Sequence, residues 1–248
     1  MKGRRILLTR PAGQNERLAD LVRAAGGEPV EVPAIEIGPP DDPRPLRAAA
    51  DRLEDYDLAV FVSPNAVDQA MAAIRSRREW PVGLRAATVG PASAQALARH
   101  GVRDVLAPSD RFDSEALLAL PALADVRGRR VVIFRGDVGR ELLGDTLRER
   151  GATVEYVACY RRLRPAAGAG ALEHGGIDAV VVTSSEGLRN LFEMAGAAGR
   201  ARLQRTPVFA PHARIAETAR ALGCAQVIET APGDAGLAAA LCAFWAKM

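Results

Sequence analysis

Residues 153–165, TVEYVACYRRLRP, and residues 28–40, EPVEVPAIEIGPP, indicate how the chain is divided into lobes. Each follows a glycine, Gly151 or Gly26, of the kind that ends a helix, and each opens with residues that favour a strand. Each runs past the usual length of about five or six strand residues and ends in proline, which has no N–H for a β-ladder. The pattern predicts two over-long strands that carry the chain between two lobes.

Around these stretches, short apolar runs alternate with segments of helical spacing. The run LAVFV at residues 58–62 is wholly apolar, as buried strands of parallel sheets are. We expect further strands at 4–10, 85–89, 104–106, 129–135 and 178–185, and helices at 14–25, 45–56, from Ser63 onward, at 91–100 and at 113–120. Strands that alternate with helices of about 10–15 residues predict an α/β fold with parallel sheets and right-handed crossovers.

The chain also contains an internal repeat. RRVVIFR at residues 129–135 matches RRILLTR at residues 4–10, and DAVVVTSS at residues 178–185 matches DLAVFVSP at residues 57–64. A repeat of such a long period predicts two similar α/β lobes.

Polar residues follow the predicted strands, where parallel sheets bind their ligands. These strand ends carry Thr9-Arg10, Ser63, Gly90-Pro91, Arg135-Gly136-Asp137, Thr183-Ser184-Ser185 and Ala210-Pro211-His212. Helix starts offer free N–H groups to an anion, and arginine binds carboxylate in a bidentate manner. If the lobes face each other, these residues line a cleft suited to an acidic small molecule. The alternative is ordinary N-capping by serine and, for Arg140, a surface salt bridge.

Composition narrows the class of protein. The 248 residues are 48% apolar and 25% charged, as in soluble globular proteins, and a net charge of +3 without a Lys/Arg block argues against nucleic-acid binding. No stretch approaches the ~20 apolar residues of a membrane span, and the N-terminal apolar run is too short for a secretion signal, so we expect a cytoplasmic protein. Cys159, Cys224 and Cys242 form no metal-ligand pattern and are expected to be reduced and buried.

Familiar cofactor motifs are absent. No GxGxxG follows either first strand, and GxxxxGK[ST] occurs nowhere. His100, His174 and His212 belong to no visible triad or metal set. The motifs therefore give no support to a dinucleotide, nucleoside-triphosphate or metal site.

The chain resembles the uroporphyrinogen-III synthase family along essentially its whole length. The motifs that carry the resemblance are LLTRP (7–11), VSPNAV (62–67), TVGPASAQAL (88–97), FRGDVGRELLGDTLRERGA (134–152), YRR (160–162), VVTSSEGL (181–188) and PHARIAETARALG (211–223). None is diagnostic singly, but their order and spacing together are specific.

The resemblance implies two flavodoxin-like parallel-sheet lobes joined by a two-stranded β-ladder. Lobe 1 is then discontinuous. The implied bounds are 1–36 with 167–248 for lobe 1, 42–159 for lobe 2, and 34–41 with 159–166 for the ladder.

The resemblance also implies a reaction. The linear tetrapyrrole hydroxymethylbilane closes to uroporphyrinogen III with loss of water and inversion of ring D, and no cofactor is needed. The substrate is a polycarboxylate whose hydroxyl leaves readily, so the enzyme mostly has to orient it, with one acid to help water depart. The family further implies a monomer without nucleic-acid or membrane partners, with room for a transient contact to the preceding pathway enzyme.

Site residues follow by matching the family's motifs. Tyr160 matches a tyrosine beside the cleft and is the candidate general acid or positioning donor, although it could also be an ordinary strand aromatic. Contacts to substrate carboxylates, largely through backbone N–H groups, are expected at Ser63, Asn65, Ser93, Ser184 and Ser185. The expected cationic supplements are Arg10, Arg135 and Arg140, with Asp137 beside them. His212 stands where many relatives have a hydroxyl residue.

Two other functions stay open at this stage. One is a two-lobed nucleotide-sugar transferase, which shares twin α/β domains but needs a sugar-nucleotide clamp that the sequence does not display. The other is a non-catalytic binding protein for an anionic ligand, since no residue is unmistakably catalytic.

Overall fold

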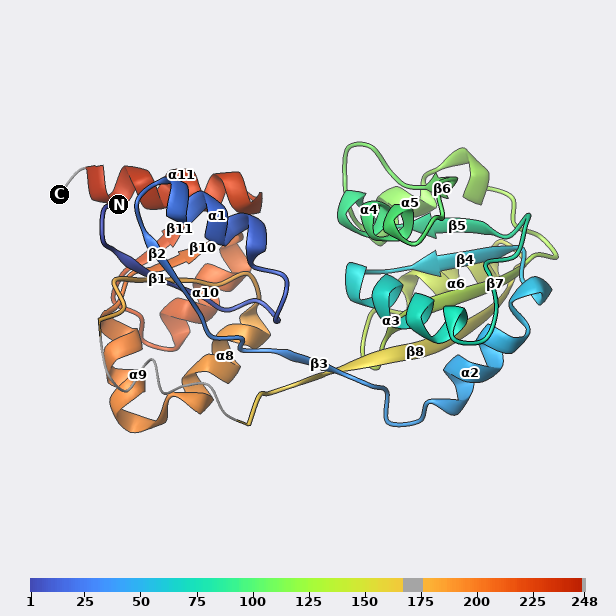
Figure 1. Ribbon diagram of the computed structural model, residues 1–248. Coiled ribbons are helices and arrows are strands. Elements are labelled where there is room, and N and C mark those ends of the chain that lie inside the picture. Colours follow the sequence, from blue (N-terminus) through green and yellow to red (C-terminus); the bar gives the residue numbers. More distant parts are fainter. Residues whose placement is uncertain (167–175, 247–248) are drawn as a thin grey trace. The chain divides into compact units, whose positions relative to one another are not determined.

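The computed structural model describes residues 1–166 and 176–246 and divides into two compact units (Figure 1). Unit 1 is Met1–Glu36 with Leu163–Met248, and unit 2 is Ile37–Arg162. Residue 167, where the second segment of lobe 1 was expected to begin, and His174 lie outside the described residues. The finer domain bounds stay a prediction.

Unit 1 is built on a five-stranded sheet whose order is β11-β10-β9-β1-β2. Every pair of neighbours in it is parallel. Its strands are β1 (Arg5–Leu8), β2 (Glu28–Glu31), β9 (Ala179–Val181), β10 (Val208–Ala210) and β11 (Val227–Glu229). The three central strands β1, β9 and β10 are almost wholly buried, as the apolar strands of a covered parallel sheet should be, and only Arg5 at the start of β1 is polar.

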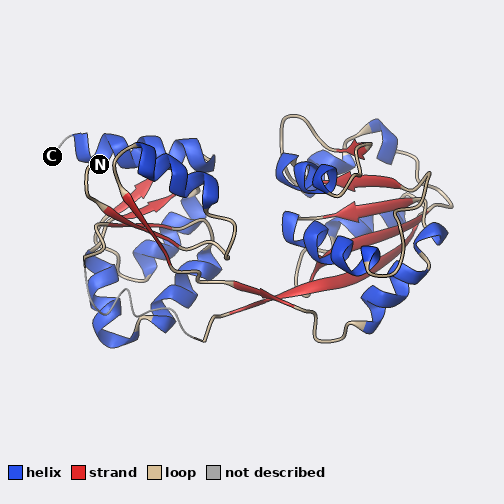
Figure 2. Cartoon of the chain, in the orientation of Figure 1, coloured by secondary structure: helices blue, strands red, loops and turns tan. Residues whose placement is uncertain are grey.

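Helices cover both faces of this sheet (Figure 2). They are α1 (Glu16–Ala24), α8 (Ser185–Met194), α9 (Gly196–Arg205), α10 (Ala213–Ala221) and α11 (Gly233–Ala246). One apolar cluster joins α8, α9 and α10 to the sheet, and a second joins α1 and α11 to its other face. In the second cluster, Phe209 of β10 meets the edge of Phe244 from α11, with ring centroids 5.5 Å apart.

Unit 2 is built on a six-stranded sheet with the order β3-β8-β7-β4-β5-β6. The run from β8 to β6 is parallel throughout. Its strands are β3 (Glu36–Gly38), β4 (Leu58–Phe61), β5 (Arg85–Thr88), β6 (Val105–Leu106), β7 (Arg130–Gly136) and β8 (Thr153–Leu163). The expected α/β fold with parallel sheets is therefore confirmed in each unit.

Helices again lie on both faces of the sheet in unit 2 (Figure 2). They are α2 (Arg44–Asp51), α3 (Pro64–Arg75), α4 (Pro91–Arg99), α5 (Ser114–Leu118) and α6 (Leu142–Glu149), with short 3-10 turns at Leu53–Asp55 and Pro121–Leu123. One cluster packs α2, α3 and α4 on the sheet around the stacked rings of Phe61 and Phe134. The other packs α5 and α6 on the opposite face.

The first of the two stretches that were expected to form over-long strands is divided. β2 ends at Glu31, and β3 begins only at Glu36 and belongs to the other sheet. Pro33 has no N–H to give to a β-ladder at the break. The side-chain amide of Asn190 donates a hydrogen bond to the carbonyl of Ala34 at 2.9 Å. The prediction of one strand over residues 28–40 was wrong, whereas β8 is a single strand of 11 residues.

The three cysteines differ in exposure, contrary to the expectation that all are buried. Cys159 and Cys224 are buried, and burial raises the pKa of their thiols to about 12 and about 11. Cys242 lies on the outer side of α11 and is exposed. A helix at the surface has one face toward solvent, and because α11 is almost wholly apolar after Asp234, its sequence does not show which face that is.

This difference predicts the reactivity of the thiols. Because alkylation needs an accessible thiolate, we expect iodoacetamide at pH 8 to modify Cys242 in the folded protein and to spare Cys159 and Cys224. In urea all three should react. Peptide mapping by mass spectrometry measures the sites, and modification of Cys159 before unfolding would contradict the packing described for β8.

Candidate functional site

In each unit, the parallel strands bring the predicted site residues to one edge of the sheet. In unit 1, Arg10, Ser184 and His212 follow the carboxyl ends of β1, β9 and β10, which are neighbours. Unit 2 places Ser63 after β4 and Asp137 after β7, and these strands are also neighbours. Thr9 Oγ1 donates to the carbonyl of Val181 at 2.9 Å and so joins two of these ends in unit 1.

Helices begin at these edges, and their first turns differ in capping. Ser63 caps α3 by accepting the Ala66 N–H at 3.1 Å, and Ser184 caps α8 by accepting the Gly187 N–H at 3.3 Å. Gly90 at the start of α4 and His212 at the start of α10 supply no side-chain cap. First-turn N–H groups without a cap take their hydrogen-bond acceptor from water or from a ligand.

Tyr160 is one of the most deeply buried of the predicted site residues. Its side chain is buried, and its hydroxyl lies 3.2 Å from Ser63 Oγ. Its carbonyl accepts the Asp137 N–H at 3.0 Å, which fixes β8 against the end of β7. The structure therefore brings Tyr160, Ser63 and Asp137 together at the carboxyl edge of unit 2.

The remaining predicted contact residues occupy helix starts. Ser93 is buried in the first turn of α4, and Asn65 is partly buried in the first turn of α3. Ser185 Oγ accepts a hydrogen bond from Thr218 Oγ1 at 3.0 Å, which ties α8 to α10. His212 is exposed.

All three predicted arginines have carboxylate partners within their own unit. Arg10 lies 2.6 Å from Asp234 at the start of α11, and Arg140 lies 3.2 Å from Glu115 of α5 while its side chain stays exposed. A ligand carboxylate can still compete for an arginine in such an ion pair, but the pair reduces the binding free energy that the ligand gains.

Arg135 differs because it is buried, and it holds the loop after β7. Its Nη1 donates to Glu141 Oε1 at 2.8 Å, and its guanidinium lies over the ring of Tyr156, 4.7 Å from the centroid. A Cβ on Gly139 would come within 2.9 Å of Nη2, so the loop wraps closely around the side chain. Arg135 thus serves the fold of the loop that carries Asp137.

Sequence reasoning missed several of these partners. Asp234, Glu141 and Glu115 were not assigned to the arginines, since a carboxylate's partner depends on tertiary packing. Of the three carboxylates, Asp234 had a local signal in the sequence, since it stands at the start of a helix. It meets Arg10 because α11 begins at the edge of the sheet where β1 ends.

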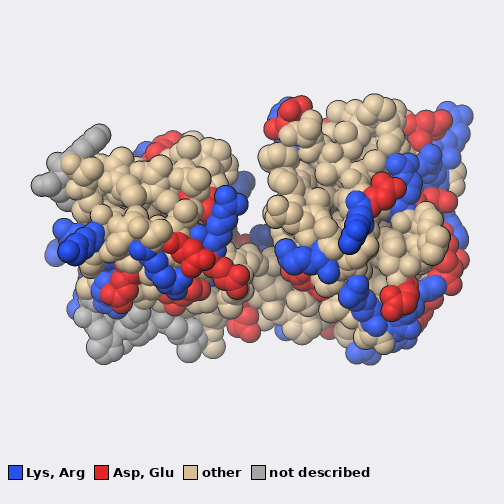
Figure 3. All heavy atoms as spheres, turned by 45° about the horizontal axis from the view of Figure 1, so that its top comes forward, with Lys and Arg blue, Asp and Glu red and all other residues tan. Residues whose placement is uncertain are grey.

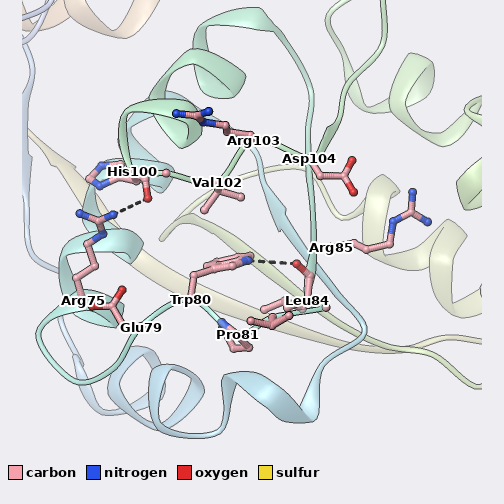
Figure 4. A pocket seen from close by; sticks show the side chains of 13 residues that line it. Arg75, Glu79, Trp80, Pro81, Leu84, Arg85, His100, Val102, Arg103 and Asp104 are labelled. Atoms are coloured by element: carbon pink, nitrogen blue, oxygen red, sulfur yellow. Dashed lines mark hydrogen bonds between the residues drawn. The ribbon is translucent and has the colours of Figure 1, made fainter.

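A hollow lies at the other edge of unit 2, and its charged lining residues are Arg75, Arg85 and Arg103 with Glu79 and Asp104. Its volume is about 460 Å³, and Figure 4 shows it between the end of α3, the loop before β5 and the end of α4. Arg75 donates to the carbonyl of His100 at 2.5 Å there, and Trp80 donates to that of Leu84 at 3.2 Å. Helix C-termini carry partial negative charge, which opposes carboxylate binding.

Surface charge and metal ligands add no competing site in the described part of the chain. Positive and negative side chains are interspersed over the face of each unit in Figure 3. Within residues 1–166 and 176–246, no three His, Cys, Asp or Glu side chains gather as metal ligands would. Across the same residues, no helix has the length and apolar character to cross a membrane.

Comparison with known proteins identifies the family. The family model described as "Uroporphyrinogen-III synthase HemD" matches residues 16–239. The chain is 38% identical over 245 residues to the uroporphyrinogen-III synthase of Salmonella typhimurium, an alignment that covers 94% of this chain and 98% of that protein. It is 34% identical to that of Escherichia coli over 201 residues, covering 76% of this chain and 79% of that protein.

Solved structures with the same fold bear the same name. The uroporphyrinogen-III synthetase of Helicobacter pylori aligns over 98% of both chains with a TM-score of 0.59 and 14% identity. A mutant uroporphyrinogen III synthase of Thermus thermophilus aligns over 98% of both chains with a TM-score of 0.57 and 21% identity. These findings do not favour the sugar-nucleotide or binding-protein alternatives, and they confirm the resemblance: the chain belongs to the uroporphyrinogen-III synthase family.

Proposed function

We propose that this protein is a hydro-lyase that cyclises hydroxymethylbilane to uroporphyrinogen III, with loss of water and inversion of ring D. The observation that carries the proposal is the family match over residues 16–239, which includes the helix starts at both carboxyl edges. No bound cofactor is needed, since the substrate's hydroxyl leaves readily and orientation is most of the work. We further propose that the enzyme acts in the cytoplasm as a monomer.

Substrate carboxylates would bind to main-chain N–H groups at these edges. The N–H groups in the first turns of α4 and α10 are the most available to a ligand, because neither helix has a side-chain cap. Ser93 lies in the first turn of α4. A helix N-terminus carries partial positive charge in addition to its free N–H groups. This explains how a chain with a net charge of only +3, whose site arginines are paired, would hold a polycarboxylate.

We further propose that the two units are flavodoxin-like lobes related by the internal repeat. The order β2-β1-β9-β10-β11 in unit 1 corresponds to β8-β7-β4-β5-β6 in unit 2. Both follow the 2-1-3-4-5 pattern of doubly wound sheets once β7 is counted as the first strand of unit 2. The adjacency of β3 and β8 supports the ladder through which the chain would pass between lobes.

Tyr160 is our candidate for the acid that helps water leave. Its hydroxyl is held by Ser63 beside the start of α3. A phenol that gives up its proton there would have the helix N-terminus to stabilise the charge that develops.

Incubation with hydroxymethylbilane tests the function. The spontaneous closure gives isomer I, so the protein should redirect the product to uroporphyrinogen III, because only a structured site can impose ring inversion. Chromatography of the oxidised products measures the ratio of isomers. A product that remains isomer I at every protein concentration would refute the proposal.

Replacement of Tyr160 by phenylalanine tests the acid. The ring remains in its cluster, so the melting temperature should change little, while kcat should fall about 10-fold, less than general acid catalysis usually supplies because the leaving group is labile. The remaining product should still be isomer III. If kcat equals that of the wild type while the fold is intact, Tyr160 is only a strand aromatic.

A further inference from the structure

A β-bulge in β8 determines the direction of the Tyr160 side chain. Arg135 of β7 pairs with Ala158, but the next residue, Gly136, pairs with Tyr160, so Cys159 is an extra residue on β8. A bulge of this kind changes the face to which the following side chain points.

Burial along β8 shows the effect of this extra residue. Val157 and Cys159 belong to the apolar cluster beneath α3, whereas Val154 and Tyr156 pack on the opposite face of the sheet. Strict alternation would send Tyr160 to the face of Tyr156. Instead it belongs to the cluster beneath α3, with Val157 and Cys159.

Two neighbours then limit where the phenol can lie. On one side, a Cβ built on Gly136 would stand 3.1 Å from Tyr160 Cζ and 3.3 Å from its hydroxyl oxygen, so the ring rests directly on the bare backbone. On the other side is Ser63, whose own position is set by its cap bond to the Ala66 N–H. These two neighbours restrict the position of the Tyr160 ring and its hydroxyl.

We propose that Ser63 and Gly136 are positioning residues for Tyr160. Ser63 aims the phenol oxygen, and Gly136 gives the ring the space it needs to reach Ser63. The inference rests on the proposed function of Tyr160 as the acid, and it assigns Ser63 a role through Tyr160 rather than a direct contact with substrate carboxylate.

The variants follow from the local chemistry. Ser63→Ala removes the hydroxyl, while Ser63→Thr keeps both the hydroxyl and the ability to cap α3. Gly136→Ala adds one methyl against the ring, and since Gly136 has no positive φ, alanine brings no backbone strain. Thr88→Val is the matched control, because it removes a buried hydroxyl that bonds the Phe61 carbonyl at 2.8 Å and leaves Tyr160 untouched.

Kinetics decide between positioning and substrate contact. We expect Ser63→Ala and Gly136→Ala each to lower kcat about three- to tenfold with little change in KM, and to have almost no further effect in a Tyr160→Phe background. Ser63→Thr should restore most of the rate, and Thr88→Val should keep it. An effect of Ser63→Ala that raises KM and persists in the Tyr160→Phe background would overturn the proposal in favour of a carboxylate contact.

A spectroscopic readout separates this inference from the proposed function. The chain has three tyrosines, so protein labelled at tyrosine ¹³Cζ gives three signals, and the one lost in Tyr160→Phe is Tyr160. Ser63→Ala and Gly136→Ala should shift that signal and leave those of Tyr56 and Tyr156 in place. An unmoved Tyr160 signal would refute positioning even in an active enzyme. A shifted signal in a protein that yields only isomer I would instead refute the proposed function and keep the contact.

Discussion

Parallel pairing of the strands is the constraint on which the rest of each unit depends. Because β1 runs parallel to β2 and β9, and β7 to β8 and β4, all the strands that precede helices end at the same edge of their sheet. The helices that cover the two faces therefore begin at that edge, and their N–H groups and dipoles gather there. In the proposed function, a polyanion would meet complementary partial charge at one edge of each unit, although Arg10, Arg135 and Arg140 are paired with carboxylates there.

The bulge in β8 adds a side chain of defined direction, that of Tyr160, to the edge proposed to bind the substrate. Helix starts offer N–H groups and partial positive charge to carboxylates but no side-chain acid of their own. By inserting Cys159 opposite the bond between Arg135 and Gly136, the strand turns Tyr160 toward Ser63 and the start of α3. In the proposed function, binding and proton donation would thus depend on separate features, one set by topology and one by a single extra residue.

Much of this arrangement could be predicted from local sequence, and the exceptions have physical causes. The apolar run of β4 and the serines that cap α3 and α8 are local signals, so they were found directly. Pro33 was a local signal too, but its effect was underestimated beside the β-branched residues around it. The bulge could not be predicted, because it exists only in the pairing of β7 with β8.

The partners of the arginines also could not be predicted from local sequence. A substrate contact of Arg135 stays a prediction, whereas its observed neighbours Glu141, Tyr156 and Gly139 could not be predicted, because they come together only when the loop folds. The exposure of Cys242 could not be predicted either, because the almost wholly apolar sequence of α11 does not show which face of the helix lies toward solvent. The function could nonetheless be predicted from the sequence, because the strand-end motifs keep the order of the family along the chain.

The central claim is that main-chain N–H groups at the carboxyl edges bind the substrate's carboxylates. Titration of ¹⁵N-labelled protein with uroporphyrinogen III, followed through the amide resonances, tests it most directly. If these N–H groups bind the carboxylates, the largest shifts should occur in the first turns of α3 and α4 in unit 2 and of α8 and α10 in unit 1. Shifts gathered instead at the opposite edge of unit 2, around Arg85 and His100, would contradict it.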